Sequence, residues 1–197
     1  MKNTWLLLLT FAVTSTSFAQ NEKYVASITA YQKKYVKEHE VVQKADKKYF
    51  RFFPVDEKYN LLCNFEKLND TIGFTMKTSA NTLKEYFKYG KISFMIHDTA
   101  CQLFVYQSKD LMKVDKYKEY LFIPFTDLTS GDESYGSGRY LEFYFKDIKN
   151  NKIQVDFNKA YNPYCAYATG FRCPIPPKEN HLAVAIKAGE KTFAKTH

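Results

Sequence analysis

The feature that most constrains the fold of this chain is an alternation of apolar and polar side chains with a period of two. It is clearest where Leu141, Phe143 and Phe145 alternate with Glu142 and Tyr144. This period places successive side chains on opposite faces of an extended strand, whereas a helix needs a period of about 3.6. Strand-like segments lie at residues 50–54, 59–65, 71–75, 83–89, 91–97, 102–107, 120–125, 140–145, 153–158 and 182–187.

The aromatic content also favours strands. The chain holds 16 Tyr and 17 Phe but only 7 Gly, and aromatic side chains pack well on the pleated face of a sheet. About nine short strands with turns between them predict a mainly β protein of the α+β class, built as an antiparallel sandwich or a partly open barrel. We expect a hairpin at Gly90, because this residue separates two strand-like segments.

An amphipathic helix is predicted before the strands. Tyr24, Ile28, Tyr31 and Tyr35 recur at helical spacing, with lysine and glutamate between them. A basic amphipathic helix can lie on a membrane surface. Because its stripe consists mainly of tyrosine, we expect this helix to pack on the domain instead.

The first residues have the pattern of a secretory signal peptide. Lys2 precedes an apolar run from Trp5 to Val13, and Ala19 ends a small-x-small cleavage pattern. The apolar run is too short to span a bilayer, which needs roughly 20 residues, so no integral membrane span is predicted. We expect export to the periplasm or secretion. The predicted organisation is a signal peptide at residues 1–19, the helix at 20–48 and one β-rich domain at 49–197.

The net charge of +8 does not predict nucleic-acid binding. Lysine supplies most of the positive charge, and arginine occurs only at Arg51, Arg139 and Arg172. Bidentate recognition of bases depends on arginine more than on lysine. A solvated, lysine-rich surface that binds polyanions weakly is the favoured interpretation.

The four cysteines fall into two pairs. Cys165 and Cys173 bracket a short loop of turn-forming residues and are the candidate disulfide, because export makes disulfides possible. Cys63 and Cys101 lie in apolar, strand-like runs. They are predicted to be buried free thiols, since free cysteine behaves as a small hydrophobe.

Arg139 is the first candidate for a ligand-binding residue. It follows a glycine-containing loop that also holds Tyr135, and it opens a strand-like segment. A guanidinium in this position can meet a carboxylate or phosphate. The alternative is an arginine that holds its own loop through carbonyl groups or through Asp132 and Glu133.

The loops after residue 157 supply the other candidates. Asn158, Tyr161 and Asn162 lie in one loop, and Glu179 and Asn180 lie in the next. Amides and tyrosines together are typical of sites for polar small molecules or sugars. The alternative is a loop that folds on itself, with asparagine side chains bonded to backbone groups.

Three functions stay open from these residues. The first is binding of a polar or anionic small ligand, such as a glycan or a cell-envelope fragment, around Arg139. The second is a hydrolase or transferase with Glu179 or Glu133 as acid or base. The third is a purely structural envelope protein. The sequence leaves the oligomeric state open.

No cofactor or metal is predicted. Gly136 and Gly138 precede a strand-like segment and lack the third glycine of a dinucleotide fingerprint. The spacing of Cys165, Cys173 and His181 matches no zinc pattern.

Five ordered blocks resemble the domain-of-unknown-function 1684 family, roughly over residues 45–193. They are residues 125–131, 135–141, 156–167, 173–180 and 188–191. The resemblance implies no activity that can be transferred. Ser137 departs from the family pattern, which has three consecutive glycines before Arg-Tyr. Ser137 stands in place of the middle glycine. If that glycine needs a positive φ, Ser137 strains the loop. If it only lets a ligand approach, Ser137 narrows the site.

Overall fold

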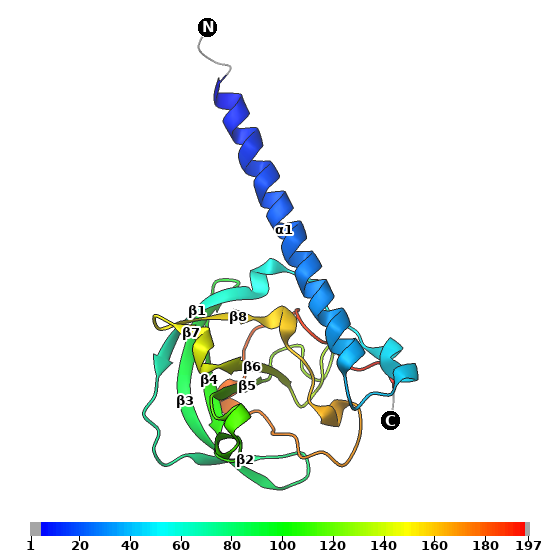
Figure 1. The fold of residues 1–197 in the computed structure, drawn as a ribbon, viewed down its shortest axis with the longest axis vertical. Coiled ribbons are helices and arrows are strands. Elements are labelled where there is room, and N and C mark those ends of the chain that lie inside the picture. Colours follow the sequence, from blue (N-terminus) through cyan, green and yellow to red (C-terminus); the bar gives the residue numbers. More distant parts are fainter. Residues whose placement is uncertain (1–4, 196–197) are drawn as a thin grey trace.

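The structure is a computed structural model that describes residues 5–195, with the side chains of residues 21–195. One long helix, α1 (Trp5–Glu38), leads into a sheet of eight strands. All pairings between the strands are antiparallel. Figure 1 shows the C-terminal two thirds of the chain gathered around this sheet, with the N-terminal part of α1 projecting away from it. The prediction of a mainly β, antiparallel fold with an N-terminal helix is confirmed.

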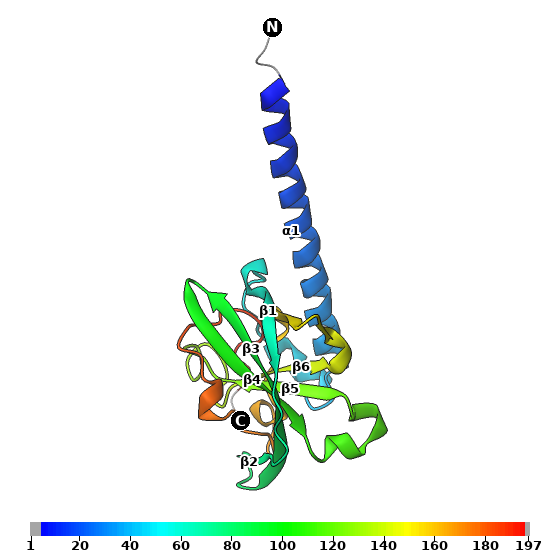
Figure 2. The same ribbon diagram turned by 90° about the vertical axis from the view of Figure 1, so that its left-hand side faces the viewer.

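The sheet is one continuous layer. Its strands are β1 (Asn60–Lys67), β2 (Phe74–Lys77), β3 (Leu83–Ile96), β4 (Thr99–Ser108), β5 (Tyr120–Phe125), β6 (Arg139–Tyr144), β7 (Ile148–Lys149) and β8 (Lys152–Asp156). The order across the sheet is β6-β5-β4-β3-β1-β8-β7, and β2 pairs with β3 alone. Strands from both ends of this order, β6 at one end and β7 and β8 at the other, line a common cleft. The sheet is therefore open but curled, as Figures 1 and 2 show.

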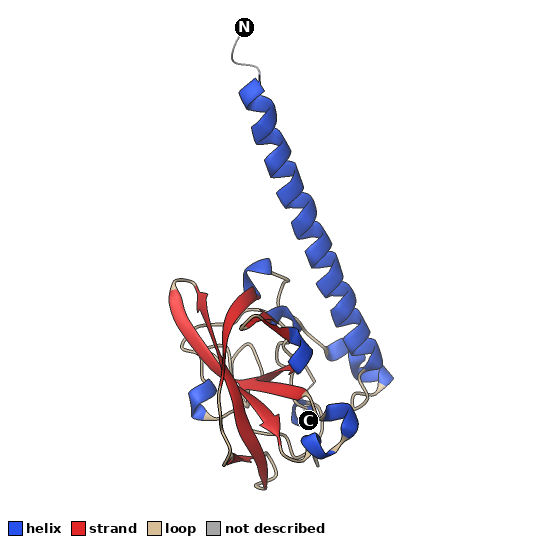
Figure 3. Ribbon diagram, turned by 60° about the vertical axis from the view of Figure 1, so that its left-hand side comes forward, coloured by secondary structure: helices blue, strands red, loops and turns tan. Residues whose placement is uncertain are grey.

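Short 3-10 helices surround the sheet (Figure 3). They are η1 (Lys44–Tyr49), η2 (Glu57–Tyr59), η3 (Leu111–Lys113), η4 (Asp115–Tyr117), η5 (Phe145–Asp147), η6 (Phe157–Lys159), η7 (Tyr164–Ala166) and η8 (Lys178–Asn180).

The alternating apolar residues form the main core. Leu103 and Val105 of β4, Ile123 of β5 and Val155 of β8 are fully buried in one cluster. Burial of such side chains contributes about 1.5–3 kcal/mol each. The period-two pattern thus turns one face of a strand such as β1 inward, as expected. In β5 both faces are buried, because Phe122 on the other face packs with Tyr106 and Tyr140 in a second cluster.

The last predicted strand, residues 182–187, has the alternation but not the pairing of a strand. Leu182, Val184 and Ile186 are buried in the main core. The backbone N–H of Leu182 donates to the Thr126 carbonyl (2.8 Å), and Leu128 N–H donates to the Val184 carbonyl (3.2 Å). The segment crosses the sheet's core as an irregular chain, because side-chain burial does not by itself require a ladder of hydrogen bonds.

The expected hairpin at Gly90 is wrong. Gly90 lies inside the uninterrupted strand β3, at an irregularity in its register with β4. A Cβ at this position would overlap the ring of Phe65 and lie 2.9 Å from the Glu66 carbonyl oxygen. The glycine therefore permits close approach. The chain reverses instead at His97 and Asp98, which both have positive φ.

Helix α1 packs on the domain through one apolar residue and several polar ones. Ile28 is buried, the Tyr24 hydroxyl donates to Asp156 (3.0 Å), and the Gln32 amide donates to the Asn158 carbonyl (3.4 Å). Part of the predicted tyrosine stripe therefore faces the domain. In the described part of the chain, no helix is both long and apolar enough to cross a membrane.

The predicted signal peptide falls at the start of α1. Residues 1–4 and the side chains of residues 5–19 lie outside the described part of the structure.

Candidate functional site

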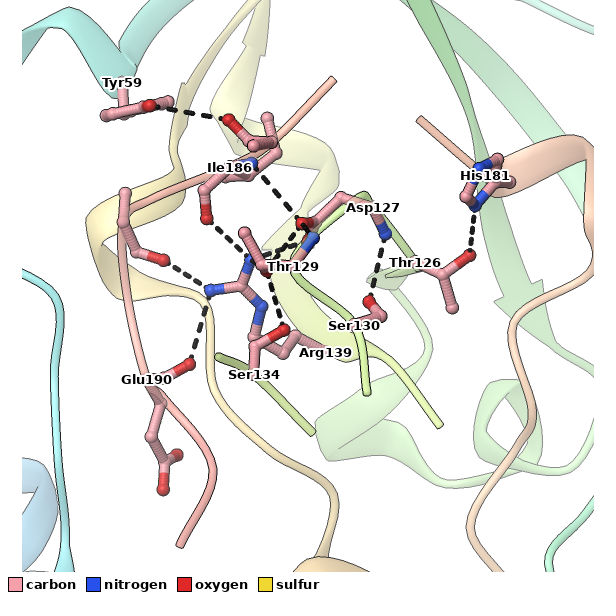
Figure 4. A network of polar contacts seen from close by, with 12 residues as sticks. Tyr59, Thr126, Asp127, Thr129, Ser130, Ser134, Arg139, His181, Ile186 and Glu190 are labelled. Carbon is pink, nitrogen blue, oxygen red and sulfur yellow. Dashed lines mark hydrogen bonds and ion pairs between the residues drawn. The ribbon is translucent and has the colours of Figure 1, made fainter. Parts of the chain in front are cut away.

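Arg139, the predicted ligand anchor, lies in the protein interior (Figure 4). It opens β6, and its side chain is 0% exposed. Its Nη2 atom forms an ion pair with Asp127 (2.7 Å) and donates to the Ile186 carbonyl (2.9 Å). Its Nη1 atom donates to the carbonyls of Ala188 and Glu190. The guanidinium joins three segments of the chain, and a ligand has no access to it in this structure.

The loop before Arg139 folds around its ion-pair partner. Asp127 accepts hydrogen bonds from the backbone N–H (2.7 Å) and the hydroxyl (2.6 Å) of Thr129. The Thr129 hydroxyl also lies 2.8 Å from that of Ser134. The geometry is that of an arginine that holds its own loop, with Asp127 as the acidic partner instead of Asp132 or Glu133.

The departure of Ser137 from the family pattern causes no backbone strain. Ser137 is exposed and does not have a positive φ. The next residue, Gly138, has a φ of +86°, and a Cβ there would lie 2.7 Å from the Cγ of Pro176. The glycine requirement therefore falls on Gly138, which this chain retains.

The three predicted asparagines are buried and join segments of backbone. Asn158 accepts from the Asp56 N–H (3.0 Å) and donates to its carbonyl (2.9 Å). Asn180 bonds in the same way to the N–H (2.8 Å) and carbonyl (2.9 Å) of Phe104. Asn162 donates to a backbone carbonyl 2.8 Å away. Their side chains therefore bond to backbone groups of the protein, which was the predicted alternative to ligand binding.

The candidate carboxylates pair with lysines. Glu179 lies 2.9 Å from the Lys88 ammonium and accepts from the Tyr106 hydroxyl (2.8 Å). Glu133 lies 3.1 Å from the Lys187 ammonium. Neither carboxylate lines the two clefts described below.

The Cys165–Cys173 disulfide is formed, with the two Cα atoms 6.3 Å apart, while Cys63 and Cys101 are free. The predicted pairing is therefore confirmed. Tyr135 supports this region, because its hydroxyl donates to the Cys165 carbonyl (3.4 Å). The disulfide closes a loop whose last residues form part of a cleft wall.

That cleft is a concave feature close to the predicted residues, and we call it the tyrosine cleft. Its volume is about 890 Å³, and it lies between α1 and the segment that follows β8. Its aromatic lining comes from Tyr31, Tyr35, Tyr117, Tyr140, Tyr161, Tyr164 and Phe171. Its charged lining comes from Lys34, Glu38, Glu40, Lys84, Glu142 and Arg172. Tyr161 is the one predicted ligand-binding residue among them.

Hydrogen bonds hold the tyrosine rings of the cleft floor. The Tyr161 hydroxyl donates to Glu142, and the Tyr140 hydroxyl donates to the Pro174 carbonyl. Tyr140 and Tyr161 also pair through their backbones. Burial, followed by the charges of Tyr120 and Glu142, raises the pKa of Tyr161 well above its usual value. The phenol therefore stays protonated and acts as a donor.

A second cleft adjoins the first and is called here the lysine cleft. Its volume is about 850 Å³, and it lies between α1 and the two edges of the curled sheet. Lys146, Lys149, Lys152 and Lys159 line it. Tyr31, Glu142 and Tyr161 line both clefts. The two clefts therefore adjoin at these three residues. Together we call them the groove beneath α1, with an aromatic end and a basic end.

A buried polar cluster lies behind the aromatic end. Glu190 is 0% exposed and accepts from the hydroxyls of Tyr167 (2.7 Å) and Tyr35 (3.3 Å) and from the Asn162 N–H (3.0 Å). Burial raises the pKa of Glu190 to about 7. Because Tyr35 belongs to α1, this carboxyl group is part of the contact between helix and domain.

His39, which follows α1, is buried among aromatic rings at the same end. Its Nδ1 atom accepts from the Val42 N–H (3.2 Å). Burial, and then the charge of Lys47, lowers its pKa to about 4, so the ring is neutral. Among the described residues its Nε2 atom has no hydrogen-bond partner.

Sequence reasoning missed Glu142 and gave no role in a site to Tyr31 or Tyr35. Both tyrosines belonged to the helical stripe, and Glu142 was a polar position of the β6 alternation. No motif joins these residues, because they meet only through the curling of the sheet and the docking of α1. In the described part of the chain, no group of three or more His, Cys, Asp or Glu side chains is placed to hold a metal ion.

The fold and the groove define a class of β-rich protein: one curled antiparallel sheet, an N-terminal helix docked beside it, and a buried arginine–aspartate pair. Residues 45–191 match the family described as "Protein of unknown function (DUF1684)", and the chain belongs to this family.

A solved structure with a similar fold is the solution NMR structure of the uncharacterized protein from gene locus rrnAC0354 of Haloarcula marismortui. The two chains are 27% identical with a TM-score of 0.64, and the similarity covers 88% of this chain and 97% of that one. Comparison with curated proteins gives no match.

Proposed function

We propose that this protein is exported and binds a sugar-based polar ligand in the groove beneath α1. The observation that carries the proposal is the lining of the tyrosine cleft, where aromatic rings from five separate segments surround one space among charged side chains of both signs. Its volume of about 890 Å³ falls within the usual range for ligand sites, roughly 300–1,000 Å³.

The chemistry of this lining suits a sugar. The C–H face of a sugar ring is apolar, and it packs against the negative face of an aromatic ring. The hydroxyl groups around the sugar's edge need donors and acceptors, which Lys84, Arg172 and Glu142 supply. A purely apolar ligand would leave these polar groups unpaired, which costs free energy.

The rings are fixed before a ligand arrives. Tyr140 and Tyr161 are held by hydrogen bonds to groups of the protein, so little side-chain entropy is lost on binding. Tyr31 and Tyr164 remain about 40% exposed at the two sides of the cleft. Part of each side chain is therefore open to solvent. The Lys159 ammonium lies 5.6 Å from the centroid of the Tyr31 ring.

Two features support export. The first residues have the pattern of a cleavable signal. The Cys165–Cys173 disulfide is also of a kind that persists in oxidising compartments. Fractionation of cells that make the protein with a C-terminal tag tests this part of the proposal. Recovery of an uncleaved protein in the cytosol would contradict it.

Binding is tested by calorimetric titration of the protein with soluble hexasaccharides, both neutral and acidic. The informative variants are Tyr31→Ala and Tyr164→Ala, because both rings are partly exposed and their loss should leave the fold intact. We expect each variant to weaken binding at least about tenfold, which corresponds to about 1.4 kcal/mol.

The matched control is Phe87→Ala, since Phe87 is a half-buried aromatic residue of β3 outside both clefts. It should bind as the wild type does. Absence of binding to every hexasaccharide, or equal affinities for the wild type and the two tyrosine variants, would refute the proposal.

A further inference from the structure

At the basic end of the groove, two lysines lie directly opposite each other, an arrangement that destabilises the strand pair that carries them. β7 and β8 form a hairpin that turns at Asn150 and Asn151, both with positive φ. Lys149 and Lys152 are direct partners across this hairpin. Like charges at directly opposed positions of an antiparallel pair destabilise it.

No acidic side chain relieves this repulsion. Among the described residues Lys146, Lys149 and Lys152 form no salt bridge, and Lys159 pairs only loosely with Asp156 (4.0 Å). Three lysines without a salt bridge therefore line one cleft. The ammonium group of Lys146 lies 5.5 Å from the centroid of the Tyr144 ring.

Three carboxylates also line the lysine cleft, those of Glu142, Asp147 and Asp156, and each accepts hydrogen bonds from the protein. Asp147 accepts from the backbone N–H of Tyr144 (2.8 Å). Asp156 accepts from the Tyr24 hydroxyl (3.0 Å) and the Asn158 N–H (3.0 Å). These carboxylates hold local structure but keep their charge. With four lysines against three carboxylates, the lining has an excess of one positive charge, and its most basic part is the hairpin of Lys149 and Lys152.

The basic end also continues directly into the aromatic end. Tyr31, Glu142 and Tyr161 line both clefts, so the two clefts meet at these residues. A neutral oligosaccharide would use only the tyrosines. A molecule with negative groups along its length would use the lysines as well.

We propose that the ligand is an acidic oligosaccharide, with sugar rings in the tyrosine cleft and carboxylate or phosphate groups bound by Lys146, Lys149 and Lys152. This inference rests on the proposed function, because it specifies the ligand class of the same groove. Lys149 and Lys152, which lie opposite each other in the β7–β8 hairpin, make the groove select acidic over neutral oligosaccharides.

The test compares two probes that differ in charge alone: a hexamer of galacturonic acid and its carboxyl-reduced, neutral counterpart. Calorimetric titration at low salt should show that the acidic hexamer binds at least about tenfold more tightly. Its affinity should fall as salt is raised, because exposed charges are screened over about 10 Å at 0.1 M ionic strength.

The informative variant is the double charge reversal Lys149→Glu/Lys152→Glu. It should weaken binding of the acidic hexamer at least about tenfold, since opposite charges become like charges. It should leave the affinity for the neutral hexamer unchanged. The matched control is Lys44→Glu/Lys178→Glu, which changes the net charge equally at exposed lysines outside both clefts and should have little effect.

Two results would overturn the inference: equal affinities for the acidic and neutral hexamers, or equal losses in the hairpin variant and its control. If Tyr31→Ala still abolishes binding in either case, the proposed function stands and only the charge specificity fails. If Tyr31→Ala has no effect on either hexamer, the proposed function itself fails. Urea unfolding of each variant should show that it retains its fold.

Discussion

The Nη2 atom of Arg139 lies 2.7 Å from the Oδ2 atom of Asp127, and both side chains are wholly excluded from solvent. They lie twelve positions apart in the chain. They tie the start of β6 to the loop after β5, and the same guanidinium bonds to the carbonyls of the C-terminal segment. Removal of one partner of such a pair leaves an uncompensated buried charge.

The first prediction concerns this pair. Arg139→Met and Asp127→Asn should each lower the free energy of unfolding by about 3–5 kcal/mol. The double variant should lose clearly less than the sum, because neither buried charge remains. Urea unfolding of all four proteins measures the coupling.

The control for this comparison of single and double variants is the surface ion pair of Lys187 and Glu133. Lys187→Met should cost at most about 1 kcal/mol, as exposed ion pairs usually do. Strict additivity at Arg139 and Asp127 would show that they do not act as a pair.

The second prediction concerns Glu190 and pH. The pKa of Glu190 is about 7 in the folded protein, against 4.5 for the ordinary side chain. The folded state therefore favours the protonated carboxyl group. Its stabilising effect is fully present below about pH 4.5 and is lost as the pH rises through about 7.

Glu190→Gln keeps a neutral side chain in place and should remove this dependence. Between pH 5 and pH 8 the wild type should lose stability relative to the variant, by about 2–3 kcal/mol. Urea unfolding at both values measures the difference. Glu22→Gln, an exposed position on α1, should follow the wild type. Parallel curves for wild type and Glu190→Gln would contradict the assignment.

The third prediction separates two reasons why a glycine resists substitution: a positive φ, and a close contact that a Cβ atom would make. Gly138→Ala should destabilise the protein by more than about 1 kcal/mol, because a positive φ and contact with the Phe125 carbonyl both oppose a Cβ. Gly170→Ala has a similar φ of +89° with nothing within 4 Å, so it measures the backbone cost alone and should be milder.

A companion variant tests the departure from the family pattern. Ser137→Gly should change stability by no more than about 0.5 kcal/mol, because Ser137 is exposed and its φ is not positive. Thermal unfolding compares the three variants. A larger loss for Gly170→Ala than for Gly138→Ala would show that the close contact at Gly138 is unimportant.

The fourth prediction concerns the disulfide. Cys165→Ser/Cys173→Ser should lower the free energy of unfolding by about 2–3 kcal/mol, the chain-entropy value for a short loop. Reductant should destabilise the wild type similarly and leave the double variant unchanged. An equal effect of reductant on both proteins would point to chemistry at Cys63 or Cys101.

Several elements were predictable because their evidence is local. The alternation at Leu141 and Phe143 gave a strand, and the spacing of Ile28 and Tyr31 gave a helix. The disulfide of Cys165 and Cys173 followed from two cysteines that bracket a short loop of turn-forming residues. Each inference depends on residues near one another in sequence, where backbone geometry alone fixes the relation.

Other expectations failed where a residue distant in sequence determines the local conformation. Gly90 has the appearance of a turn residue, but the ring of Phe65 on β1 requires its lack of a side chain. The alternating segment 182–187 fills the core without pairing as a strand. Sequence periodicity tells which side of a segment is apolar, but it does not tell which neighbour covers that side.

The sequence by itself determined that this protein is β-rich, has a helix before its strands, forms one local disulfide and belongs to its family. Only the tertiary structure decided that Arg139 faces Asp127 in the interior and that Tyr31, Glu142 and Tyr161 share a groove. The physical reason is that burial and pairing are properties of contacts between distant segments. Those contacts are set by how the sheet curls and where α1 docks, and no local pattern of residues encodes either.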